Sequence, residues 1–185
     1  MIDATPLLRL YARQRLRRLA RQRPAETQER QLLRLVRQAQ GTRFGRDHGF
    51  ARILSVRDFQ ERVPLRRYED FWAEYWKSAF PRLTDITWLG TIPYFAATSG
   101  TTTGRNKYIP VSHAMLRANN FAAFDLLVHH LANRQESRVF GGRSFMLGGS
   151  ADLREEAPGI FSGDLSGIAT REVPRWLRGW TFPPP

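Results

Sequence analysis

The chain has 185 residues, enough for one domain with a substantial core, and its 42% hydrophobic and 25% charged residues are typical of a globular protein, not a disordered one. It contains no cysteine, which excludes disulfides, thiolate catalysis and cysteine-based zinc sites. The net charge of +12 is unevenly placed, since residues 1–46 carry twelve arginines and only three acidic residues.

Apolar residues recur at helical spacing near the N-terminus and predict a helix from about residue 5 to residue 22. Pro24 is expected to end it, and Thr27 is expected to cap a second helix that Gly41 ends. So basic a segment could bind nucleic acid or a membrane surface, but it lacks the interleaved aromatic residues on which bases stack. We therefore expect residues 1–40 to form a basic helical segment with solvated arginines and no nucleic-acid arm. The apolar stripe of the first helix comprises Leu8, Ala12, Leu16 and Leu19.

The next segment is predicted to alternate loops with short helices. Residues 41–50, GTRFGRDHGF, are punctuated by glycine and predict a loop. Ser55 is expected to cap a helix that Pro64 interrupts, and another helix is expected from about Tyr68. Aromatic residues at helical spacing in this last helix predict a packed face, not a ligand site: Phe71, Trp72, Tyr75 and Trp76.

Two β-branched or aromatic runs follow. Residues 86–97 predict extended structure with a kink at Gly90 and Pro93, and residues 107–111, KYIPV, predict a second short strand. Ser112 is expected to cap a long helix that reaches about Asn133. Its apolar stripe comprises Leu116, Phe124, Leu127, Val128 and Leu131.

The C-terminal part predicts a short buried strand within residues 144–150 and a loop with embedded apolar residues at 159–169. Its last residues are rich in tryptophan and proline. No metal site is predicted, because the paired polar residues along the chain lack further ligands at a suitable spacing and are expected to be structural or solvated. These pairs are Asp47–His48, His129–His130 and Glu155–Glu156.

The segment between the two strands, TSGTTTGRNK (98–107), is rich in small hydroxyl side chains and glycine. It matches neither the Walker phosphate loop nor the dinucleotide-binding glycine pattern. Glycines nevertheless let backbone N–H groups converge on anionic oxygens, and Lys107 would add a positive charge. From the residues alone, an anion-binding loop and a flexible Ser/Thr hairpin both stay open. The further hydroxyl donors are Ser99, Thr101, Thr102 and Thr103.

A resemblance to known proteins favours the anion-binding loop over the flexible Ser/Thr hairpin. The segment closely resembles the phosphate loop of the adenylate-forming superfamily, Thr/Ser-Ser-Gly-Thr-Thr/Ser-x-Gly-x-x-Lys. The flanking residues 42–50, 56–71 and 163–176 resemble one branch, the auxin-responsive acyl-acid amido synthetases (the plant Gretchen Hagen family and its bacterial relatives). Thr103 occupies a variable position, and the fixed positions are met by Thr98, Ser99, Gly100, Thr101, Thr102, Gly104 and Lys107.

The resemblance implies an α/β fold: the N-terminal part of an adenylate-forming large domain, with a helical N-terminus and then an incomplete β-sheet with flanking helices. Residues 86–185 would hold the phosphate loop and the sheet region, and the C-terminal domain would be absent. The implied reaction is ATP-dependent activation of a carboxylic acid as an acyl-adenylate, followed by amide formation with an amine. ATP and Mg²⁺ are the implied cofactors, and residues 98–107 would contact the β and γ phosphates.

Other expectations stay beside this one. The alternative functions are an acyl-CoA ligase of the same superfamily and a non-enzymatic basic binding module that uses residues 1–46. The chain resembles the N-terminal third of such an enzyme, so residues 1–185 alone are expected to be inactive. No catalytic residue is identified, and Asp164 is not assigned to ribose because its context, GDLSGIA, does not fit that motif. With no bilayer-spanning run and no secretory signal, a cytoplasmic location is expected.

Overall fold

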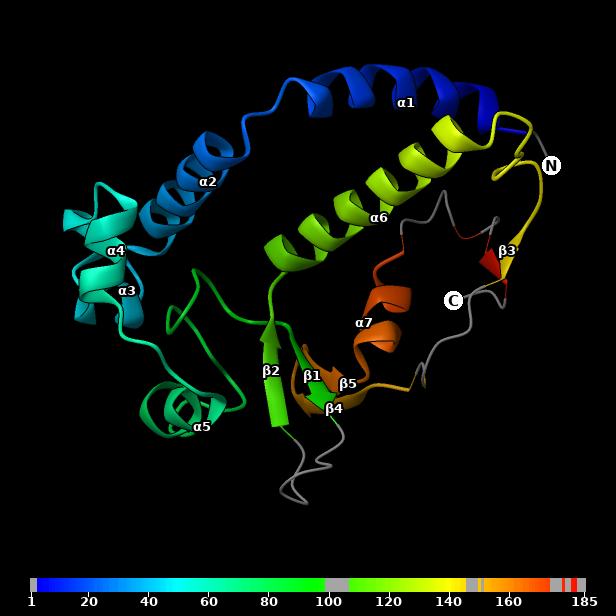
Figure 1. The fold of residues 1–185 in the computed structure, drawn as a ribbon. Coiled ribbons are helices and arrows are strands. Elements are labelled where there is room, and N and C mark those ends of the chain that lie inside the picture. The colour runs from blue at the N-terminus through cyan, green and yellow to red at the C-terminus, as the bar shows by residue number, and fades with distance from the viewer. Residues whose placement is uncertain are drawn as a thin grey trace. The chain divides into compact units, whose positions relative to one another are not determined.

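The chain folds into two compact units with helices and an open sheet (Figure 1). The structure, a computed structural model, describes residues 3–98, 107–145, 150, 152–173, 178 and 181–182. The first unit comprises Met1–Gln22, Tyr94–Glu155 and Phe161–Pro185, and the second comprises Arg23–Pro93 and Glu156–Ile160. The prediction of an α/β fold with a helical N-terminus is confirmed.

The regular elements are mostly short. Helical elements dominate residues 5–76, and the strands all follow residue 93. In chain order the elements are α1 (Thr5–Ala20), α2 (Pro24–Ala39), α3 (Arg43–Asp47), the 3-10 helix η1 (Phe50–Arg52), α4 (Val56–Arg62), α5 (Tyr68–Phe71), the π-helical turn η2 (Trp72–Trp76), β1 (Tyr94–Thr98), β2 (Lys107–Val111), α6 (His113–Asn133), β3 (Ser144–Phe145), β4 (Arg154–Ala157), β5 (Ile160–Gly163), α7 (Leu165–Arg171) and β6 (Thr181–Phe182).

In the first unit, helices α1 and α6 lie side by side (Figure 1). Helix α1 buries Leu8 and Ala12, as its apolar spacing predicts. Helix α6 begins as predicted, because the Ser112 side chain accepts a hydrogen bond from the Met115 amide and so satisfies a free N–H of the first turn. Its predicted end at residue 133 is also confirmed. Its buried residues are Leu116, Val128 and Leu131.

The main sheet has four strands in the order β2-β1-β5-β4. Strand β1 pairs antiparallel with β2 and parallel with β5, with Tyr94 opposite Val111 on one side and opposite Phe161 on the other. A two-residue turn with Gly159 at φ +76° joins β4 to β5. One face of β1 packs in a core with the first turns of α6 and with α7, and its buried members are Tyr94, Ala96, Val111, Leu116 and Ile168. A separate parallel pair joins β3 and β6.

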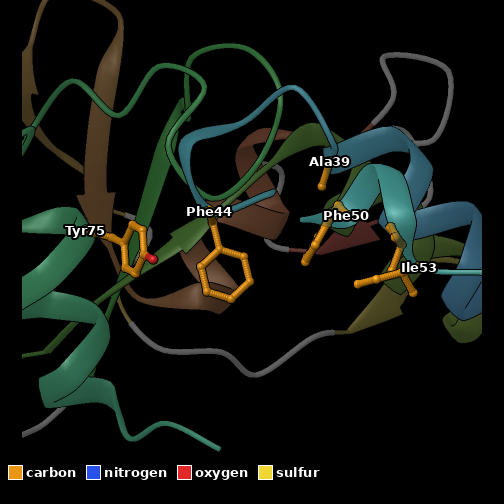
Figure 2. Close-up of a cluster of buried hydrophobic side chains, with 6 residues drawn as sticks. Ala39, Phe44, Phe50, Ile53 and Tyr75 are labelled. Atoms are coloured by element: carbon orange, nitrogen blue, oxygen red, sulfur yellow. The ribbon is translucent and has the colours of Figure 1, made fainter. Parts of the chain in front are cut away.

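The second unit has its own aromatic core (Figure 2). The ring of Phe44 lies edge-on to Phe50 and Tyr75, with ring centroids 5.7 and 5.2 Å apart. Phe71 and Trp76 stack on each other at 5.2 Å and pack against the same core, so the predicted aromatic face of residues 68–76 is confirmed. The buried members of this core are Val36, Ala39, Phe44, Phe50, Ile53 and Tyr75.

The second helix differs from its prediction in its first residue. It starts at Pro24 and not after Thr27, which lies inside it. Proline has no N–H to leave unpaired and its φ is already helical, so it suits the first position of a helix, which Arg23 precedes without a side-chain cap. Glu26 is the acidic residue of the first turn.

Two predicted loops are wrong. Residues 41–50 form α3 and the start of η1, because Thr42 caps α3 and Phe44 and Phe50 enter the aromatic core. Residues 159–169 form β5 and the start of α7, where Ile160 and Ile168 are buried. In both segments, tertiary burial outweighs the local turn preference of glycine and aspartate.

Three smaller differences concern the strands. Glu155 and Glu156 lie on strand β4 and not in a loop. Regular extended structure in the predicted run 86–97 is confined to β1, and only an isolated bridge between Thr84 and Thr91 precedes it. In the run 144–150, strand β3 ends at Phe145, and residues 146–149 lie outside the described part of the chain. Among the described residues, no helix is both long and apolar enough to cross a membrane.

Candidate functional site

The β1–β2 hairpin brings together the two ends of the Ser/Thr/Gly segment. Five residue pairs define its register, and the last pair joins Thr98 to Lys107. Paired residues of an antiparallel ladder lie about 5 Å apart, so the ladder fixes both ends of the eight-residue connection 99–106. The predicted phosphate contacts within that connection lie outside the described residues: Ser99, Gly100, Thr101, Thr102, Thr103 and Gly104.

Alternation along the strands places Thr98 and Lys107 on a defined face of the sheet. Residues two apart on a strand share a face, and directly paired residues on neighbouring strands share it too. Thr98 and Lys107 therefore lie on the face of Tyr94 and Ala96, which packs against α7 and the start of α6. Thr98 is exposed and Lys107 is half-buried. Lys107 is therefore the first residue of β2, at the end of the hairpin where the connection 99–106 closes.

The carboxyl ends of the parallel strands β1 and β5 meet at the same edge as this hairpin end. Ala96 pairs with Gly163, after which Asp164 begins the turn into α7. Open α/β sheets bind ligands at the carboxyl ends of their strands. The Asp164 carboxylate accepts a hydrogen bond from the Ser150 amide at 3.1 Å, which gives it a structural partner at this edge.

A second polar cluster lies at the opposite end of β1. The Tyr94 hydroxyl donates a hydrogen bond to the Glu172 carboxylate, and His113 Nδ1 lies 3.8 Å from the other oxygen of Glu172. Burial, and then the bond to this carboxylate, raise the pKa of Tyr94 to about 12. The cluster connects the first residue of α6 with the residue after α7, and both helices pack on the same face of β1. It therefore fixes the two elements that cover the face of Lys107.

The neighbouring residue of α7 adds a cation–π contact to this cluster. The Arg171 guanidinium carbon lies 3.9 Å from the centroid of the Phe161 ring. The contacts of Tyr94 with Glu172 span 78 residues, and no local pattern in the sequence signals them. Residues 163–176, which include Glu172, resemble the acyl-acid amido synthetases. This resemblance was the one indication in the sequence that the segment contributes to a site.

Residues of the polar pairs that the sequence analysis excluded as metal sites form hydrogen bonds within the protein. His48 is buried, with Nδ1 2.8 Å from the Phe44 carbonyl oxygen, and Asp47 accepts a hydrogen bond from the Tyr75 hydroxyl. His130 Nε2 lies 2.9 Å from Ser137 Oγ at the end of α6. Across the described residues, no group of three or more histidine, aspartate or glutamate side chains is placed to hold a metal ion.

Comparison with known proteins agrees with the fold. The model of the GH3 family N-terminal domain matches residues 13–183. A solved structure entitled "AtGH3.15 acyl acid amido synthetase in complex with 2,4-DB" matches with a TM-score of 0.68 and 16% sequence identity over 85% of this chain. The chain spans 27% of the length of that protein. Among curated proteins, none is similar in sequence.

Proposed function

As the chain belongs to the GH3 family, we propose that it carries the ATP-phosphate-binding hairpin of an acyl-acid amido synthetase. In the proposed reaction, a carboxylate oxygen attacks the α-phosphorus of ATP, pyrophosphate leaves, and an acyl-adenylate forms. An amine then attacks the activated carbonyl, and AMP leaves as the amide bond forms. The observation that carries the proposal is the pairing of Thr98 with Lys107 at the end of the β1–β2 hairpin.

The residues of the hairpin end suit a polyphosphate. Lys107 supplies a compact positive charge from a strand, and Thr98 supplies a hydroxyl on the same face. Between them, Gly100 and Gly104 allow close backbone approach, and the hydroxyls of residues 99 and 101–103 can donate to phosphate oxygens. Such donors stabilise the charge that develops on departing pyrophosphate. Holding ATP and acid together supplies on the order of 7–11 kcal/mol through proximity.

Mg²⁺ would reach this site bound to the nucleotide. Mg²⁺ keeps several waters and commonly binds through substrate phosphates with one or two carboxylates, so it needs no all-protein cage. The hairpin end provides the cation of Lys107 and the hydroxyl of Thr98 for the phosphates, and the metal would arrive with ATP. When bound, the metal would neutralise charge on the phosphates.

Replacing the hairpin lysine tests the proposal. In a complete enzyme that contains this sequence, Lys107→Ala is expected to reduce acid-dependent pyrophosphate release by at least about a hundredfold, the usual effect of removing one donor to developing charge. Lys77→Ala is the matched control, because Lys77 is the only other lysine and lies exposed after η2. The proposal is wrong if both variants release pyrophosphate at the rate of the unmodified enzyme.

The acceptor distinguishes the proposed function from the acyl-CoA ligase alternative. Both enzymes form an acyl-adenylate, so pyrophosphate release alone does not separate them. We expect AMP formation to be coupled to consumption of an amine or amino acid, with an amide as the product. Coupling to a thiol with formation of a thioester would favour the alternative. Mass spectrometry of the acid-derived product gives the answer directly.

A further inference from the structure

The contacts of α1 with α6 fix which side of α1 faces α6 and which side faces away from it. Arg15 forms two hydrogen bonds of 2.7 Å with the Asp125 carboxylate, and Arg9 donates to the Ser137 carbonyl at 2.7 Å. Leu8 and Ala12 are buried on the same side. Because successive helical residues are 100° apart, these contacts set the orientation of every other side chain of α1.

The side of α1 that faces away from α6 carries large apolar side chains exposed to solvent. Leu7 is 73% exposed, Leu10 is 68% exposed and Tyr11 is 40% exposed. At 100° per residue these three side chains fall within a stripe about 100° wide. Single exposed apolar residues are ordinary on a protein surface, but three neighbours on one helix face indicate an interaction surface. All three precede residue 13, where the match to the family model begins.

Beside the polar Gln14, the same side of α1 and its C-cap carry four arginines. Arg13, Arg17, Arg18 and Arg21 are exposed, and none of them forms an ion pair with a carboxylate among the described residues. The residues of α1 include no aspartate or glutamate. Arginines in the last turn also stabilise a helix through its dipole, which accounts for Arg17 and Arg18 but not for the exposed leucines.

We propose that this outer face of α1, defined by Leu7, Leu10, Tyr11 and the four exposed arginines, binds the surface of an anionic lipid bilayer. The apolar side chains would enter the boundary between headgroups and acyl chains, and the arginines would contact lipid phosphates. Stable attachment at a membrane surface takes two signals, and this helix offers both an apolar stripe and a cluster of cations. The inference is independent of the proposed adenylation activity.

Charge and apolarity together favour a bilayer over a nucleic acid. Phosphate contacts in a duplex would use the arginines but would leave Leu7 and Leu10 without a role. A bilayer uses both kinds of side chain. The excess of arginine over acidic residues in residues 1–22 adds long-range attraction to an anionic surface.

Vesicle flotation of the full 185-residue chain tests the proposal. The chain is expected to float with vesicles of phosphatidylcholine and phosphatidylglycerol, and to float much less with phosphatidylcholine alone or in high salt. The Arg17→Gln/Arg21→Gln variant is expected to bind about 30-fold more weakly, because each arginine near an anionic surface contributes about a fivefold change. The Leu7→Gln/Leu10→Gln variant is expected to lose at least about tenfold in affinity at unchanged net charge.

Matched controls distinguish binding by this face from the effects of net charge and of exposed leucines elsewhere on the chain. Arg30→Gln/Arg34→Gln removes the same charge from exposed positions of α2, and Leu54→Gln/Leu65→Gln replaces leucines that are 79% and 103% exposed. Both control variants are expected to float like the unmodified chain, and circular dichroism should show unchanged helicity in all four. Equal losses in variants and controls would overturn the proposal. So would flotation that ignores lipid charge, or loss with the arginine variant alone, which would indicate a purely electrostatic partner such as nucleic acid.

Discussion

At the scale of single residues, Gly45 occupies a position that admits no side chain. A Cβ built there would lie 2.1 Å from the Ala39 carbonyl oxygen, a backbone atom. The Gly45 amide donates to the side chain of Thr42, which is fully buried and also donates to the Ala39 carbonyl. Glycine here therefore permits the tight connection between α2 and α3, and the sequence pattern alone had suggested only a loop.

We predict that Gly45→Ala destabilises the protein by about 3 kcal/mol or more, because the backbone must move to relieve the overlap. Gly41→Ala is the control, since the nearest atom to its Cβ is a leucine methyl group at 4.0 Å. It is expected to change stability by less than about 1 kcal/mol. Urea unfolding at neutral pH measures both values, and similar midpoints for the two variants would contradict the packing described for Gly45.

Tyr94 gives a prediction with a defined pH window. Its pKa is raised from 10.0 to about 12, first by burial and then by the hydrogen bond to Glu172. A raised pKa in the folded state stabilises the protein fully below pH 10 and less as the pH rises toward 12. Tyr94→Phe removes this contribution, along with a hydrogen bond to a charged acceptor that is typically worth about 1.5–3 kcal/mol.

The expected result is therefore a stability difference between the unmodified chain and Tyr94→Phe that is largest below pH 10 and shrinks toward pH 12. Urea unfolding over this range measures it, and the comparison cancels the titration of the other basic groups. A difference that stays constant with pH would show that the Tyr94 hydroxyl does not titrate as this environment requires.

At the scale of elements, local signals were reliable where the local sequence and the tertiary structure agree. The cap at Ser112 and the apolar stripe after it predicted α6 to the residue at its end. The prediction of a loop at residues 159–169 was wrong because Gly-Asp and Ser-Gly favour turns when only the local sequence is considered. Pairing of β5 beside β1, and the burial of Ile160 and Ile168, override that preference. Such pairing depends on residues far away in the chain, which no window of sequence contains.

The ion pair between α1 and α6 is the element-scale contact best suited to measurement. Arg15 and Asp125 are largely shielded, with side chains 28% and 25% exposed, and their geometry is bidentate. A double-mutant cycle with Arg15→Gln and Asp125→Asn is expected to give a coupling energy of about 1 kcal/mol. The exposed pair Arg57 and Glu61 within α4 is the matched control, with an expected coupling of about 0.3–0.5 kcal/mol.

The coupling energy of the same ion pair is expected to depend on pH. Hydrogen bonds from Arg15 lower the pKa of Asp125 below its ordinary 3.8. A lowered pKa in the folded state stabilises the protein above the ordinary value, and this contribution is lost as the pH falls through the lowered one. The coupling energy should therefore be intact at neutral pH and decline only in strong acid. A coupling that already vanishes at pH 5 would contradict the shielded geometry.

At the scale of the whole molecule, the loop motif indicated the superfamily and the flanking segments indicated the family, while the division into two units could not be read from either. The motif works because a few residues with fixed chemistry recur at fixed spacing between two strands, and both strands are present as β1 and β2. The two separate cores, one around Phe44 and one around Tyr94, depend on contacts that no local pattern encodes. The partition into residues 1–40 and 86–185 as functional segments remains a prediction.

The last prediction concerns the activity of residues 1–185 in isolation. This chain spans 27% of the length of the synthetase that it resembles in fold. Within it, the sequence suggests contacts for the phosphates at residues 98–107 but none for adenine or ribose. An acyl-adenylate needs a closed site that excludes water, because an exposed one hydrolyses. We therefore expect the isolated chain to bind ATP weakly and to catalyse no acid-dependent exchange of labelled pyrophosphate into ATP.

A full-length acyl-acid amido synthetase, assayed with the same acids, is the positive control for this exchange measurement. The isolated chain is also expected to self-associate, because β2 and β4 are the outer strands of the described sheet and such edges invite pairing with other chains. Exchange should therefore be measured on the monomeric fraction after size-exclusion chromatography. If that fraction exchanged pyrophosphate at a rate close to the control, residues 1–185 would contain a complete adenylation site. The adenine and ribose contacts would then have to come from residues that the loop motif does not identify.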